Sequence, residues 1–215
     1  MKKLTLLAAF FVLLFALSTP AATCACCAER GTYQVWTTSV DSFYDSMLAE
    51  MEFGPAPELY MTEAGFESIR GLGALAKEFE TSQFENVDLV DAYTKRTWSL
   101  AFKTPTGNRG TLTLPRPSRM TIRRIYIPDN ESTSPNVWLY KELEFKGQVR
   151  GGTGFFRTGV SRPAAYTLIF QGQGNNCDSS DQFKNWRLAV KGTRADFAFF
   201  GKTKAADAER PDPAL

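Results

Sequence analysis

The sequence predicts a single-domain, mostly β protein, either an antiparallel β-barrel or a β-sandwich, with one or two short helices in its N-terminal third. Apolar residues alternate with small or polar ones through much of residues 86–201, and turn-forming residues separate the alternating segments. The composition is that of a globular domain, with 43% hydrophobic and 22% charged residues. Barrel and sandwich stay open, because either one covers the apolar faces and edges of such strands.

The N-terminus has the features of a secretory signal peptide in the usual order. Two lysines precede an apolar run over residues 4–17, and small residues with a proline follow at 18–22. The run is shorter than the roughly 20 apolar residues of a membrane-spanning helix. We expect residues 1–22 to be removed and the domain at 23–201 to be secreted or periplasmic, with no transmembrane segment.

The N-terminal third of the mature domain mixes strand and helix signals. Residues 32–40 are expected to form the first strand. Asp41 or Ser42 caps a helix whose apolar residues recur at helical spacing, and this helix ends before Gly54. A second helical candidate spans 63–80, although each glycine inside it costs about 1 kcal/mol relative to alanine.

The rest of the domain reads as a meander of antiparallel strands from about residue 86 to residue 201. Lys141 interrupts the apolar face of the strand predicted at residues 137–145. Residues 202–215 are poor in apolar side chains, and we expect a disordered tail there. The alternation or the β-branched and aromatic content predicts strands at residues 97–102, 111–114, 121–127, 137–145, 166–170, 186–190 and 195–200.

The charges are distributed unevenly. Loss of the two N-terminal lysines from a chain of formal charge +2 leaves a neutral mature protein, so bulk attraction to nucleic acid is not expected. Residues 29–91 are strongly acidic, whereas residues 92–128 carry lysine and arginine and no acid. The basic stretch could face an anionic ligand or partner. The favoured interpretation is that it folds against the acidic stretch.

The chain contains no histidine, which excludes several kinds of chemistry. Ser-His-Asp and Cys-His nucleophile systems need an imidazole base, and many zinc, copper and non-haem iron sites need an imidazole ligand. The sequence also has no nucleophile elbow, P-loop or dinucleotide fingerprint. We therefore expect no cofactor and, more generally, a protein that is not an enzyme.

One carboxylate pair leaves a catalytic alternative open. Glu142 and Glu144 share a face of a predicted strand, about 7 Å apart by strand rise, beside Trp138 and Tyr140. A glycosidase uses two such acids, with an aromatic platform for the sugar. A solvent-facing strand has the same pattern, and that interpretation is favoured.

The four cysteines are the most unusual feature of the sequence. Cys24, Cys26 and Cys27 are clustered, and Cys177 lies far away in a loop. A signal cleavage before Cys24 leaves an even number, and pairing of Cys177 with one of the three would tie the mature N-terminus to the domain. Disulfides are favoured over a Cu(I) or zinc site. Lipidation at Cys24 is a weaker alternative, because Thr23 is a poor residue before a lipidated cysteine.

The loop around Cys177 is a candidate binding loop. It is polar and contains glycine, and Asn175, Asp178 and Asp181 could ligate a hard cation such as Ca²⁺. A polar connection pinned by a disulfide is the favoured interpretation.

Together these features predict an exported, non-catalytic binding or structural protein. Its partner would be a small ligand or a protein of the cell envelope. An apolar ligand inside a barrel would use the abundant aromatic side chains. A cysteine-based metal-binding or redox protein of the envelope is the first alternative, and a carboxylate glycosidase is the second.

Overall fold

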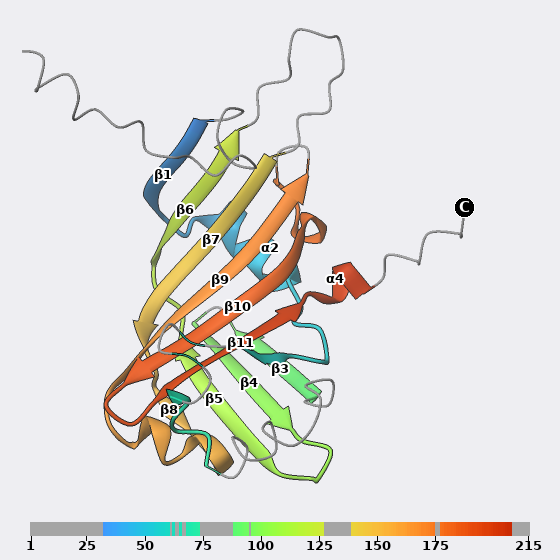
Figure 1. Ribbon diagram of the computed structural model, residues 1–215. Coiled ribbons are helices and arrows are strands. Elements are labelled where there is room, and N and C mark those ends of the chain that lie inside the picture. The colour runs from blue at the N-terminus through green and yellow to red at the C-terminus, as the bar shows by residue number, and fades with distance from the viewer. Residues whose placement is uncertain are drawn as a thin grey trace, which may run out of the picture. The chain divides into compact units, whose positions relative to one another are not determined.

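The computed structural model describes residues 32–60, 62, 65, 68–73, 88–94, 96–126, 139–174 and 177–207. Their fold is mostly β, as predicted, with two antiparallel sheets and one helix in the N-terminal third. Within these residues the strands do not close into a barrel, and the arrangement is that of a sandwich (Figure 1).

The larger sheet has seven strands in the order β1-β6-β7-β9-β10-β11-β2. The N-terminal strands β1 and β2 form its two edges, and every pairing is antiparallel. The strands are β1 (Thr32–Ser39), β2 (Glu58–Tyr60), β6 (Arg119–Tyr126), β7 (Leu139–Gln148), β9 (Ala164–Gly174), β10 (Phe183–Gly192) and β11 (Asp196–Lys202).

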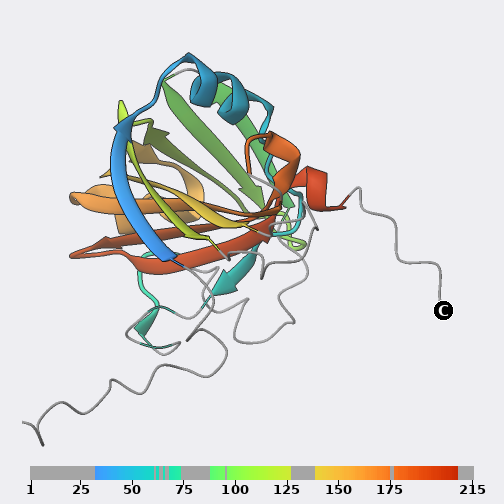
Figure 2. The same cartoon turned by 90° about the horizontal axis from the view of Figure 1, so that it is seen from above.

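The smaller sheet has four strands in the order β3-β4-β5-β8. It lies on the same side of the large sheet as helix α2 (Ser42–Glu50), as Figure 2 shows. Its strands are β3 (Asp88–Thr94), β4 (Thr97–Lys103), β5 (Arg109–Pro115) and β8 (Gly151–Gly152).

The chain is not a simple meander, because it changes sheets. It leaves the small sheet after β5, runs through β6 and β7 of the large sheet, returns as the short β8 and re-enters the large sheet at β9. Two 3₁₀ turns, Gly154–Phe156 and Gly159–Ser161, make this last return. Alternation within one strand places its faces, but it does not specify which sheet the strand joins.

Strand alternation sorts the residues as predicted. In β4, Trp98, Leu100 and Phe102 are buried and the residues between them are only partly so, and β5 and β10 repeat the pattern. Each buried side chain of this size contributes about 1.5–3 kcal/mol. Alternation thus supplies each sheet with one apolar face to pack on the other.

The aromatic side chains pack on one another between the sheets. The ring of Trp98 on β4 lies 5.2 Å from that of Phe145 on β7, and Phe102 lies 4.8 Å from Phe199 on β11. Each of these four residues is at most 1% exposed. These aromatics, which could have lined a ligand cavity, are therefore core residues.

Helix α2 begins where the sequence predicts. Asp41 is its N-cap, and its carboxylate accepts a hydrogen bond from the backbone N–H of Tyr44 at 3.0 Å. Met47 and Leu48 are buried, whereas Phe43 is half exposed. Asp45 of the helix forms an ion pair with Arg116, the residue that follows β5, and accepts a hydrogen bond from Tyr93 on β3. The ion pair joins the acidic stretch to the basic one.

The second helical candidate, residues 63–80, is not helical where the structure describes its middle. Residues 68–73 contain no α-helix, and the backbones of Arg70 and Asp196 exchange two hydrogen bonds of 3.0 Å. Gly71 and Gly73 have φ angles of 91° and 57°, which a right-handed helix cannot contain.

The described chain extends past residue 201, into the segment expected to be a disordered tail. Strand β11 includes Lys202, and residues Lys204–Asp207 form a single helical turn, α4. The Thr203 hydroxyl donates a hydrogen bond of 2.7 Å to the carbonyl of Phe183, which holds this part of the expected tail against the sheet. Residues 208–215 lie outside the described chain.

Candidate functional site

The predicted acid pair lies on the outer face of the large sheet, the face turned away from the small sheet. Glu142 and Glu144 both face the guanidinium of Arg123 on the neighbouring strand β6. Arg123 donates two hydrogen bonds to Glu144, of 2.7 and 3.2 Å, and its nearest contact with Glu142 is 3.9 Å. Lys146 adds a second cation, 2.9 Å from Glu144.

Further hydrogen bonds fix the other carboxylate. The Tyr140 hydroxyl donates to Glu142 at 2.6 Å, and the side-chain amide of Gln171 donates to both the Glu142 carboxylate and the Tyr140 hydroxyl at 3.0 Å. The cluster therefore joins β6, β7 and β9 through ion pairs and hydrogen bonds.

The electrostatics of this cluster favour an ionised Glu144. Burial alone would raise its pKa, but the hydrogen bonds from Arg123 and Lys146 outweigh burial and hold the pKa below its usual value. A glycosidase needs one carboxylic acid with a raised pKa to protonate the leaving group. This geometry does not favour that role for Glu144.

A buried lysine, Lys141, holds the loop that contains Cys177 and Asp178. Lys141, on the inner face of β7 with its side chain 8% exposed, donates a hydrogen bond of 3.0 Å to the carbonyl of Cys177 and lies 3.6 Å from the Asp178 carboxylate. Lys141 interrupts the apolar face of β7 because its ammonium holds this loop. Asp178 therefore has a protein cation as its partner.

Cys177 is fully buried and has a φ of 50°. Burial raises the pKa of its thiol to about 11. As a thiol it stays protonated near pH 7 and reacts slowly. Its predicted partners Cys24, Cys26 and Cys27 lie outside the described residues, so the disulfide stays a prediction.

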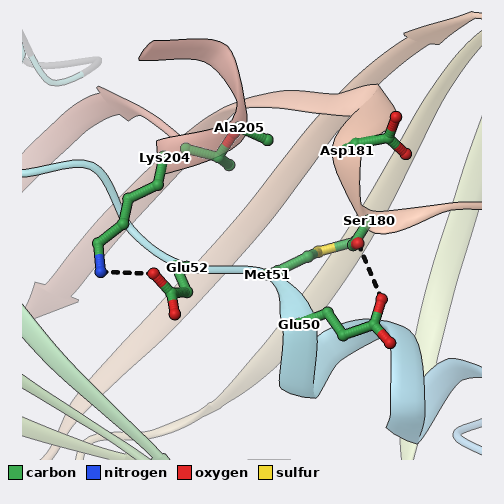
Figure 3. A pocket seen from close by; sticks show the side chains of 8 residues that line it. Glu50, Met51, Glu52, Ser180, Asp181, Lys204 and Ala205 are labelled. Atoms are coloured by element: carbon green, nitrogen blue, oxygen red, sulfur yellow. Dashed lines mark hydrogen bonds and ion pairs between the residues drawn. The ribbon is translucent and has the colours of Figure 1, made fainter. Parts of the chain in front are cut away.

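The structure describes two of the three loop candidates, Asp178 and Asp181, and places them in different surroundings. Asn175 lies outside the described residues. Asp178 pairs with Lys141, whereas Asp181 lines a small pocket of about 110 Å³ beside the end of α2 (Figure 3). In that pocket Ser180 donates a hydrogen bond of 3.0 Å to Glu50. Among the described residues, no group of three or more aspartate, glutamate or cysteine side chains could hold a metal ion.

A larger depression, which we call the outer groove, lies at the other end of the same outer face. It has a volume of about 270 Å³. Thr167, Ala189 and Ala198 are successive cross-strand partners on β9, β10 and β11, and they form its floor. The groove exists because three adjacent strands carry small side chains at one register position.

Charged residues form the rim of the outer groove: Arg187 on one side, Lys191 and Asp196 on the other. The guanidinium of Arg187 lies over the ring of Tyr60, 5.4 Å from its centre, on the edge strand β2. Its Nε is covered by protein and has no hydrogen-bond partner among the described residues.

Sequence reasoning missed this groove. The small residues Ala189 and Ala198 stand between large apolar ones in β10 and β11, which is a visible signal. Aligning them requires the register of three strands, and one sequence does not supply that register.

Comparison with protein-family models, curated proteins and solved structures gave no match. In the part of the chain described here, no helix has the length and hydrophobicity to cross a membrane. Fold and site together define an antiparallel two-sheet β protein with a closed ion-pair cluster and an open groove on one sheet face.

Proposed function

We propose that this chain is an exported, non-catalytic protein that binds a small molecule in the outer groove. The observation that carries this proposal is the groove itself: a depression of about 270 Å³ with a floor of small side chains and a charged rim. This volume is close to the lower end of ligand pockets in proteins, which begin at roughly 300 Å³.

Two further observations support binding rather than catalysis. The candidate acids Glu142 and Glu144 are engaged by Arg123, and the chain has no histidine to act as a base. The proposed groove also lies on paired strands, which give a binding surface fixed geometry without moving parts.

Export is supported by the sequence pattern of residues 1–22. Intact-mass spectrometry of protein recovered from outside the cytosol, with and without reductant, tests it. We expect the mass of a chain that begins at residue 22 or 23 and a gain of about 4 Da on reduction, because two disulfides take up four hydrogens. Recovery of only the full-length chain from the cytosol would contradict export.

The binding proposal is tested by filling the groove. Small-molecule fragments are screened against the isotope-labelled protein by NMR, and we expect one class to shift the amides of Thr167, Ala189 and Ala198. Ala189→Leu should abolish these shifts, because its side chain occupies the floor. Ala101→Leu, on a central strand of the small sheet, is the matched control and should keep them. A screen in which no fragment shifts the floor amides contradicts the proposal.

A further inference from the structure

We propose that the outer groove selects a small, flat monocarboxylate, an aromatic or unsaturated acid of the size of benzoate. This inference rests on the proposed function and adds the chemical class of the ligand. The charge of Arg187, the balance of charge at the rim and the shape of the floor each contribute to it.

No carboxylate among the described residues forms an ion pair with Arg187. Its direct cross-strand neighbours are Ile169 and Phe200, neither of which can accept a hydrogen bond from it. Arg123, in contrast, is paired with Glu142 and Glu144, and Arg116 is paired with Asp45. A partly buried guanidinium without a counter-ion attracts an anion from solution.

The position of the guanidinium is set before any ligand arrives. The guanidinium carbon lies over the ring of Tyr60, 5.4 Å from its centre, and a planar guanidinium matches the two oxygens of a carboxylate. Its covered Nε has given up water without gaining a protein acceptor, so the group is under-solvated as it stands. A carboxylate at the rim would compensate both the charge and this loss.

The other rim residues add to the same preference. Lys191 is a second cation, and Asp196 is the single acid among the groove-lining side chains. Part of the charge of Asp196 is offset by Arg70, 3.8 Å away. By formal charge the groove-lining side chains therefore comprise two cations, Arg187 and Lys191, and one acid, Asp196, a balance that favours one carboxylate over a neutral or cationic group.

The floor and the volume of the groove limit the size and shape of the ligand apart from its carboxylate. Ala189, Ala198 and Thr167 have small side chains at one register position of three paired strands, so the floor leaves room for a flat ligand. The volume of about 270 Å³ equals roughly nine times the share of one water in the liquid, which is about 30 Å³. A single unsaturated ring with one carboxylate fits this space, and a dinucleotide or a sugar chain does not.

The test compares two probes of the same shape on the wild-type protein. Benzoate and benzamide are each titrated into the labelled full chain, and the amide shifts of the floor residues report binding. We expect benzoate to saturate these shifts and benzamide to bind on the order of tenfold more weakly, the factor that corresponds to about 1.4 kcal/mol. This comparison needs no variant, so it does not depend on a mutant folding.

A matched pair of variants then assigns the carboxylate contact. Arg187→Gln should weaken benzoate on the order of tenfold and leave benzamide unchanged, whereas Arg123→Gln on the same face should change neither affinity. Equal affinities for benzoate and benzamide would overturn the carboxylate preference while leaving a binding groove. If neither probe shifts the floor amides, the carboxylate preference is overturned. The fragment screen would then decide whether the groove binds a ligand of another class.

Discussion

Two arginines on the outer face of the large sheet have opposite environments. Arg123 on β6 lies opposite Glu142 and forms an ion pair with Glu144. Neighbouring carboxylates of the same sheet therefore offset its charge. Arg187 on β10 lies between Ile169 and Phe200, and its guanidinium turns to the ring of Tyr60. The comparison shows that cross-strand register, rather than residue type, decides whether an arginine on this face is paired with a neighbouring carboxylate.

The largest difference is expected in stability. Arg123→Gln should lower the free energy of unfolding by about 2 kcal/mol, because it leaves Glu144, only 6% exposed, without its main partner. Arg187→Gln should cost about 0.5 kcal/mol or less, since no carboxylate loses its partner. Urea denaturation at pH 7 measures both. Equal losses for the two variants would show that the Arg123 cluster is not the stabilising one.

A pH series isolates the part of this effect that belongs to Glu144. Its pKa is held below the ordinary value of 4.5, so its contribution to stability is fully present above that pH and is lost as the pH falls through the folded-state pKa. The stability difference between wild type and Glu144→Gln should therefore shrink below about pH 4.5. The difference for Arg187→Gln should stay constant. Urea unfolding between pH 7 and pH 3 distinguishes the two behaviours.

The smallest expected effect concerns the stacking beneath Arg187. Tyr60→Leu keeps apolar bulk but removes the ring face, so it should cost about 0.5 kcal/mol of unfolding free energy. Benzoate affinity should fall about twofold to threefold, because the guanidinium loses the ring over which it lies and becomes less pre-organised. An NMR titration of this variant provides the measurement. An unchanged benzoate affinity would mean that Tyr60 does not position Arg187.

The sequence predicted α2 and every strand except β2, β3 and β8, because strand periodicity and an N-cap are local properties. Trp98, Leu100 and Phe102 are buried as their alternation indicates, and Asp41 caps the helix. The partners of Glu144 and the floor of the outer groove could not be predicted in this way. Both depend on which residues of separate strands lie side by side, and alternation along one strand carries no information about that register.

Lys141 is an instructive intermediate case. The sequence marks it as an interruption in an apolar face, and the structure shows that it is buried for a reason, since its ammonium binds the carbonyl of Cys177. The interruption was visible in one strand. Its partner, 36 residues further along the chain, was not.

The placement of β1 and β2 at opposite edges of the large sheet has a consequence for the order of folding. Both strands are synthesised early, but their partners β6 and β11 come much later, and the Gln34–Arg124 contact alone spans 90 residues. Closing such long loops is slow compared with forming the hairpins of β9, β10 and β11. Tyr60, which supports Arg187, arrives with β2. The outer groove is therefore expected to be among the last features to mature, so acquisition of ligand affinity would report the completion of folding.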